Sequence, residues 1–214
     1  MQRPPGTMVI DDGDLAGLIA CASAGEEAAG GKRGAVWAAP GVGVDAVARE
    51  RAVRRHAETY GLDLLSPVDA LTRPGDPDAR VSETRLLIDA GEAAIKAGLG
   101  RIVWYVHHGT PAGPGDGLDR VALACDRALL ASRLLTLDAG AGPEVRIEAA
   151  YVDFSDVQMA ELAVDLDVAL DSCWWAMAEG ANATLLAEAR AARDRWTKAM
   201  ESAGLGDLLM RAGA

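Results

Sequence analysis

The first candidate functional segment along this chain is a cluster of acidic residues. Asp11, Asp12 and Asp14, with Gly13 among them, follow a short β-branched run at 7–10 and precede leucines at helical spacing. The pattern predicts a turn and a helix N-cap, where the helix dipole favours negative charge. A structural role of this kind is enough to explain the acidic residues. The alternative is that the segment is a ligand-binding loop that acts through a metal ion.

A pair of histidines, His107 and His108, follows an apolar run at 102–106. At the end of a buried strand, such a pair could act as a general base or bind a metal together with the carboxylates of 11–14. The alternative is one histidine in solvent and one packed on the sheet edge.

Two further groups of side chains have the types that bind ligands. The Trp174-Trp175 pair could stack on a purine, or one ring could lie in the core and the other face a partner. Arg85 could hold a phosphate or carboxylate, or form a surface ion pair near a helix N-terminus. The arginines of the last helix are predicted to form a solvated face, paired with Glu188 and Asp194: Arg190, Arg193 and Arg195.

Strands and helices are predicted to alternate along the whole chain. Strands are expected at 7–10, 35–38, 62–65, 102–106 and 145–152, with a loop at 66–80. Helices are expected at 15–28, 45–60, 82–96, 118–135 and 183–203, with one more capped by Ser155. Continuous apolar strands in this order predict a parallel sheet with helices on both faces. We expect one domain over 1–214, with 171–214 as a C-terminal helical extension and ligands beyond the C-terminal strand ends.

Composition narrows the classes of partner and compartment. The net charge of −11 repels phosphate backbones, so nucleic-acid binding is not expected. The three cysteines form no CxxC pair, which argues against a disulfide framework or a structural zinc site and favours the cytoplasm. No apolar segment has the length of a membrane span.

The order of several motifs resembles the 7-cyano-7-deazaguanine synthases, which are PP-loop ATP pyrophosphatases of the HUP type. The motifs that carry the resemblance are Ala48-Arg49-Glu50-Arg51-Ala52, Thr84-Arg85-Leu86-Leu87, Arg146-Ile147-Glu148-Ala149, Val152-Asp153-Phe154-Ser155 and Ala203-Gly204-Leu205. The resemblance implies a Rossmann-like, five-stranded sheet in the order 3-2-1-4-5. It also implies a homodimeric, ATP-dependent ligase that converts 7-carboxy-7-deazaguanine to a nitrile on the path to queuosine.

The resemblance also implies a set of binding positions. It places the cofactors ATP and Mg²⁺ at Asp11, Asp12, Gly13, Asp14, Pro40, Gly41 and Arg85. For the substrate it implies Asp116, and together with the histidine pair and Trp174 we expect the substrate at His107, His108, Asp116 and Trp174. Asp116 has the position of an acidic residue that could bond the amidine edge of guanine.

Departures from the family motifs leave the activity open. Only Gly13 remains of the SGGxDS phosphate loop, and Asp156 replaces a lysine. Ala176 stands at one zinc-cysteine position, and Ala187, Arg190 and Arg193 stand near the others, so no zinc is expected. One hypothesis is a diverged relative that still binds a nucleotide or deazapurine, with ATP-dependent chemistry disfavoured. The other is a non-catalytic scaffold or interaction protein, dimeric through its C-terminal helix.

Overall fold

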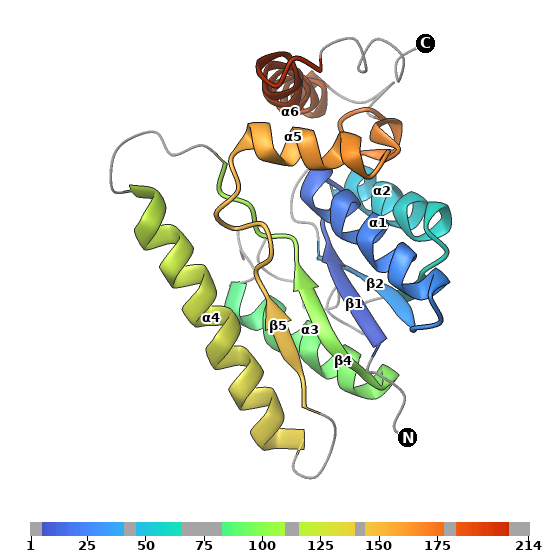
Figure 1. Cartoon of the computed structure of the whole chain (residues 1–214), viewed down its shortest axis with the longest axis vertical. Helices are drawn as coiled ribbons and strands as arrows, with labels where there is room; N and C mark the ends of the chain where they lie inside the picture. Colours follow the sequence, from blue (N-terminus) through green and yellow to red (C-terminus); the bar gives the residue numbers. More distant parts are fainter. Residues whose placement is uncertain are drawn as a thin grey trace.

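The computed structural model describes residues 6–40, 46–65, 83–109, 116–139, 144–177 and 183–205. Its strands form one parallel sheet, in the order β3-β2-β1-β4-β5 (Figure 1). The strands are β1 (Gly6–Asp11), β2 (Gly34–Ala38), β3 (Asp63–Leu65), β4 (Leu99–Trp104) and β5 (Arg146–Glu148). The helices are α1 (Leu15–Ala29), α2 (Ala46–Thr59), α3 (Glu83–Ala97), α4 (Asp116–Ala139), α5 (Asp156–Asp165) and α6 (Ala183–Ser202), with a 3-10 turn at Leu170–Ser172.

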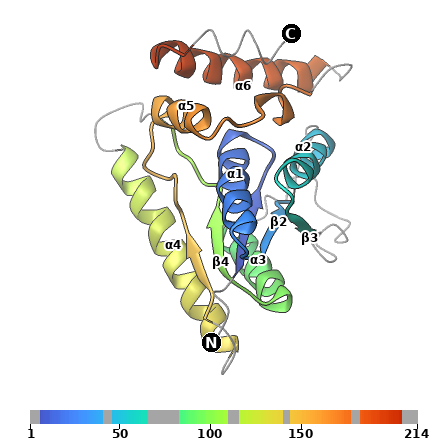
Figure 2. The same cartoon turned by 45° about the vertical axis from the view of Figure 1, so that its right-hand side comes forward.

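Each face of the sheet has its own apolar core, because side chains alternate along a strand. Val9 and Val103 pack against α1, α2 and α5, while Met8 and Ile102 pack against α3 and α4. Helix α5 lies over α1, and α6 lies across α5 on the side away from the sheet (Figure 2). The predicted Rossmann-like sheet, covered on both faces and ordered 3-2-1-4-5, is therefore confirmed.

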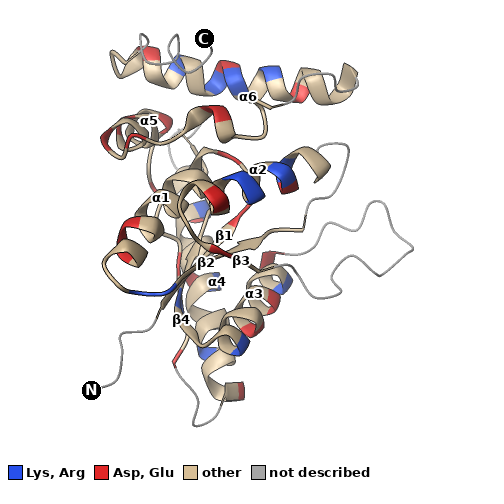
Figure 3. Cartoon of the chain, turned by 90° about the vertical axis from the view of Figure 1, so that its right-hand side faces the viewer, with Lys and Arg blue, Asp and Glu red and all other residues tan. Residues whose placement is uncertain are grey.

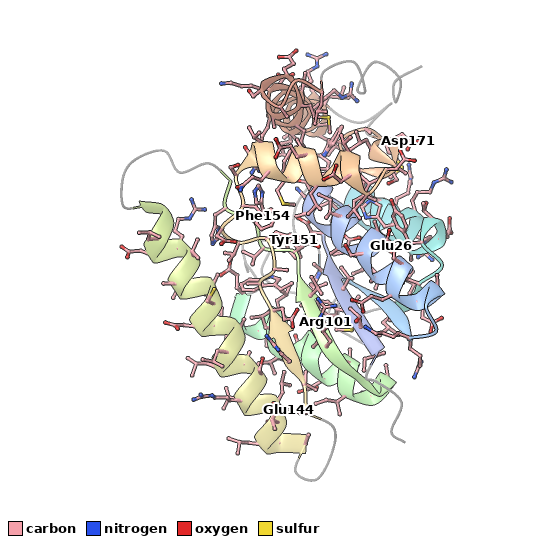
Figure 4. The ribbon with its side chains drawn as sticks, viewed as in Figure 1. Glu26, Arg101, Glu144, Tyr151, Phe154 and Asp171 are labelled. Atoms are coloured by element: carbon pink, nitrogen blue, oxygen red, sulfur yellow. The ribbon has the colours of Figure 1, made fainter. Side chains whose placement is uncertain are left out.

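The predicted bounds were wrong at two strands. Strand β4 starts at Leu99 and ends at Trp104, earlier than the apolar run at 102–106. Strand β5 covers only Arg146–Glu148, because the apolar residues after it turn instead of extending. The Val152 N–H donates to Ala149 O at 3.4 Å in this turn. Figure 4 labels Tyr151 and Phe154 beside it, and their rings meet edge to face with centroids 5.9 Å apart.

Two helical predictions can be compared with the structure directly. Ser155 caps α5 as expected, in a capping box with Gln158. In α2, Val53, His56 and Ala57 are buried as expected, but Val47 in the first turn is 69% exposed. The loop predicted at 66–80 lies outside the described residues.

Charged side chains connect the layers. Arg101 on β4, labelled in Figure 4, donates to Glu27 of α1 at 2.7 Å and to Glu148 of β5 at 3.0 Å. On the side of the molecule seen in Figure 3, acidic and basic residues are interspersed along α2, α3 and α6. Within the described part of the chain, every helix is too short or too polar to cross a membrane.

Candidate functional site

In the loop between β1 and α1, aspartate side chains accept hydrogen bonds from backbone amides of the same loop. The Gly13 N–H donates to Asp11 Oδ1 at 2.8 Å, and the Asp14 N–H donates to Asp12 Oδ1 at 3.1 Å. The Leu15 N–H donates to Asp14 Oδ1 at 2.8 Å, so Asp14 is the predicted N-cap. Gly13 takes φ +82°, which a residue with a side chain rarely adopts.

These amides are the donors that bind phosphate in a loop before a helix. Here three carboxylates of the same loop already occupy them. A phosphate would have to displace those carboxylates and remain beside their charge, which Coulomb repulsion disfavours. The backbone amides of this loop therefore have hydrogen-bond partners within the loop, which fits the structural interpretation of the Asp11–Asp14 segment.

Asp11 lies beneath the loop rather than at the surface. Its carboxylate is fully buried, and Oδ2 lies 2.7 Å from His56 Nδ1 on α2. Cys21 Sγ on α1 lies 3.6 Å from the same oxygen, and burial raises the pKa of the Cys21 thiol well above its usual range. Asp11, Cys21 and His56 could together offer three metal ligands. Asp11 contacts both of the other side chains, whereas the Nε2 atom of His56 is buried and, within the described residues, has no hydrogen-bond partner.

Asp14 anchors the C-terminal part of the chain. Its Oδ1 atom accepts from the indole Nε1–H groups of Trp175 at 2.9 Å and Trp196 at 3.0 Å. The Trp174 N–H donates to Gly13 O at 3.0 Å. One carboxylate therefore caps α1 and ties it to the 170–177 segment and to α6.

Asp12 faces the C-terminal strand ends and pairs with an arginine of α2. Its side chain is 21% exposed, and Oδ2 accepts from Arg49 Nη1 at 2.9 Å. Burial, with the nearby charges of Asp14 and Asp11, raises the pKa of Asp12 to about 7, against the opposing effect of Arg49. Near neutral pH the carboxyl can therefore either donate or accept a hydrogen bond.

A cavity of about 320 Å³ opens beside Asp12, at the C-terminal ends of β1 and β4. Its walls carry acidic, basic and aromatic side chains. They are Asp12, Asp14, Glu83, Tyr105, His107, His108, Arg120, Arg195 and Trp196, with Ala16 and Val106. A larger groove of about 1030 Å³ lies between α4 and β5, at the side of the sheet away from these strand ends.

His107 is held in one orientation inside the cavity. Its Nε2 atom lies 3.0 Å from Phe154 O, and its Nδ1 atom lies 3.2 Å from Arg195 Nη2. A carbonyl acceptor and a guanidinium donor assign the neutral tautomer with hydrogen on Nε2. Burial and the Arg195 charge lower the pKa of His107, which agrees with that assignment. The ring also stacks on Trp196 at 5.7 Å.

Two arginines supply positive charge to the cavity. Arg195 pairs with both carboxylate oxygens of Asp156, at 2.6 and 3.0 Å. Arg120 lies 3.3 Å from His108 Nδ1. Burial and the Arg120 charge lower the pKa of His108, so neither histidine adds positive charge at neutral pH. The cavity wall thus carries the guanidinium group of Arg120 and the carboxyl group of Asp12, while the charge of Arg195 is offset by Asp156.

The structure brings together Asp12, Asp14, His107 and His108, but not all of the residues expected at a site. Arg85 pairs with Asp89 at 2.7 Å on the outside of α3 and is not in the cavity wall. Pro40 follows β2 and is not in the wall either. Gly41 and the side chain of Asp116 lie outside what the structure describes.

The expected purine-stacking role of Trp174 does not fit its position. Trp174 and Trp175 are each 3% exposed, so both rings belong to the core and neither faces a partner. Arg49 lies over the Trp174 ring, 4.5 Å from its centroid. Trp196 is the tryptophan that reaches the cavity.

Several site residues were not predicted from the sequence. Arg195 was assigned to a solvated face paired with Glu188 and Asp194. Its side chain is exposed as expected, but it pairs with Asp156 and contacts His107 instead. His56 was recognised only as part of a buried helical face. Tyr105, Arg120 and Trp196 gave no signal, since they meet only when three separate segments fold together.

Comparison with known proteins gives no relative for this chain. No family model, curated protein or solved structure matches it.

Proposed function

We propose that this protein binds a small anionic heteroaromatic molecule of nucleobase size in the cavity beside Asp12, and that it does so without ATP. The observation that carries the proposal is the cavity itself, which combines the Arg120 guanidinium group, an acidic group and aromatic walls at the C-terminal strand ends. Ligands of open parallel sheets bind at such ends.

The size of the cavity favours a base over a nucleoside triphosphate. Its volume of about 320 Å³ is near the lower end of small-molecule sites, which span roughly 300–1,000 Å³. The loop that would hold a triphosphate has its Gly13, Asp14 and Leu15 amides bonded to its own carboxylates. ATP binding would therefore need both more space and a different loop.

The polar groups of the cavity suggest how a ligand would be oriented. Arg120 could receive a carboxylate, since a guanidinium binds carboxylates by charge-assisted hydrogen bonds. Asp12 could bond an amidine edge, as acceptor when ionised. A 7-carboxy-7-deazaguanine molecule carries both groups, and the resemblance of the sequence to 7-cyano-7-deazaguanine synthases supports that class of ligand.

Calorimetric titration tests the proposal. The protein is titrated with 7-carboxy-7-deazaguanine, and separately with ATP with and without Mg²⁺. We expect binding of the deazapurine and none of ATP. Arg120→Ala should weaken deazapurine binding about tenfold or more, because a hydrogen bond to a charged group contributes about 1.5–3 kcal/mol. Arg190→Ala, which removes an exposed arginine of α6, is the matched control.

Two results would overturn the proposal. Magnesium-dependent ATP binding tighter than deazapurine binding would mean that the acidic loop rearranges around a metal. No heat with any of these ligands would leave a scaffold or interaction protein on this fold as the better description.

A further inference from the structure

Helix α4 carries an unusual concentration of exposed leucines. Among the described residues, seven large hydrophobic side chains are classed as exposed, and six of them are leucines of this one helix. They are Leu118, Leu123, Leu129, Leu130, Leu134 and Leu137, and their exposed fractions run from 50% to 78%. A soluble helix usually places such side chains toward a core or a partner.

These leucines do not belong to the face that α4 packs on the domain. That inner face is formed by Ala124, Ala128, Ala131 and Leu135, which are buried against α3 and β5. With about 100° per residue, Leu130 and Leu137 lie on the opposite side of the helix from Leu135 and Ala128. Helix α4 runs along the outer margin of the molecule in both views (Figures 1 and 2).

The charges on this outer face are arranged symmetrically. Asp126 and Arg133 are both exposed, lie two turns apart, and have Leu129 and Leu130 midway between them. Within the described residues neither forms an ion pair. If a second copy of α4 runs antiparallel to the first, with the two-fold axis near Leu130, Asp126 of each copy meets Arg133 of the other. The same register places Leu123 level with Thr136 and one residue from Leu137 of the other copy.

The charge balance of α4 is compatible with the approach of a second copy. The helix carries four aspartates and three arginines, whereas the whole chain has a net charge of −11. At α4 the repulsion is nearly cancelled and two opposite-charge contacts form.

We propose that α4 is the interface of a two-fold symmetric dimer, in which the two helices pack antiparallel about Leu130. Such an interface is isologous, because the same patch on both copies must be self-complementary. Leucines fill its centre, and the Asp126–Arg133 pairs flank them and fix the register. The groove between α4 and β5 borders this face, and Glu144 marks one end of it (Figure 4). The expected dimer through the C-terminal helix would use a different surface.

Charge reversal tests the pairing. We expect the unmodified protein to sediment as a dimer at micromolar concentration. Asp126→Arg or Arg133→Asp alone should raise the dimer dissociation constant at least tenfold, since like charges then face each other. The double variant Asp126→Arg/Arg133→Asp should restore the dimer, because the swapped charges again attract. Arg190→Asp on α6 is the control and should leave the dimer unchanged.

Cysteine cross-linking tests the register independently. In a Cys125→Ser background, Leu130→Cys should give a disulfide-linked dimer on mild oxidation, because the two positions meet at the axis. Leu118→Cys should not, because it lies about 18 Å along the helix from Leu130, so the two copies would be about 36 Å apart.

Three results would overturn the proposal. They are a monomer at all concentrations up to about 100 µM, a dimer that survives both single reversals, and failure of the double reversal to restore a dimer while circular dichroism shows an intact fold. None of these results bears on ligand binding in the cavity beside Asp12, so this proposal and the proposed function fail separately.

Discussion

Asp11 Oδ2 lies 2.7 Å from His56 Nδ1, and both side chains are completely buried. The contact joins the end of β1 to the last turn of α2, two elements 45 residues apart in sequence. Gly17 on α1 makes room for it, since a Cβ atom there would lie 1.8 Å from Asp11 Oδ1. The loop that ends at Asp14 is therefore supported from below by groups from three elements.

Removing His56 should destabilise the protein strongly. His56→Ala leaves the buried Asp11 carboxylate without its closest partner, and we expect a loss of about 2–4 kcal/mol in the free energy of unfolding, measured by urea denaturation. His56→Asn can place an amide donor near the Nδ1 position, so it should lose less. In a double-mutant cycle with Asp11→Ala, the two losses should not add. Additive losses would show that the contact contributes nothing of its own.

Gly17→Ala should also lower stability, although alanine favours helices. The added methyl group would collide with the Asp11 carboxylate, and such overpacking typically costs about 1–3 kcal/mol. Gly30→Ala is the control, because Gly30 has φ −75° and its Cβ would lie 3.3 Å or more from other heavy atoms. That change should cost much less than Gly17→Ala, because the Glu27 carbonyl has to shift by only a few tenths of an ångström. Thermal melts of both variants test these expectations. A Gly17→Ala protein that is more stable than the unmodified protein would contradict them.

The sequence predicts the layers of this fold better than it predicts the site. Alternation of apolar strands with amphipathic helices is local, so the parallel sheet follows from it. The end of β5 was missed because Ala149 and Val152 are apolar in a turn as they would be in a strand. Arg195 was misassigned because nothing local distinguishes it from Arg190. Its partner, Asp156, lies 39 residues away and comes close only when α5 and α6 pack.

The raised pKa of Asp12 predicts a pH-dependent stability. Its carboxyl has a pKa of about 7 in the folded protein, mainly because of burial and the Asp14 charge, and an ordinary value of 3.8 when unfolded. Between about pH 4 and 7 the folded state therefore binds more protons than the unfolded state, so stability falls as pH rises through that window. The substitution Asp12→Asn removes this pH dependence, because asparagine does not titrate.

The measurement compares the unfolding free energies of the two proteins at pH 5 and pH 8. From pH 5 to pH 8, the unfolding free energy of Asp12→Asn should rise relative to that of the unmodified protein by about 2–3 kcal/mol. Each pH unit within the window changes the unfolding free energy of the unmodified protein by about 1.4 kcal/mol. An equal difference at both values would show that Asp12 titrates normally. A difference of opposite sign would mean that Arg49 dominates its environment.

Asp14 should matter more than an ordinary helix cap, because it also accepts from two buried indoles. Ser155 offers a matched comparison within the same protein, since it caps α5 through its side chain but holds no tryptophan. Ser155→Ala should cost about 1 kcal/mol, the usual loss for a cap. Asp14→Ala should cost roughly three times as much, because it also leaves the Nε1–H groups of Trp175 and Trp196 without their acceptor. Tryptophan fluorescence should shift in Asp14→Ala and not in Ser155→Ala. Equal losses would mean that the indole bonds contribute little and that α6 is held to the domain by its other contacts, which are apolar packing and the Arg195–Asp156 pair.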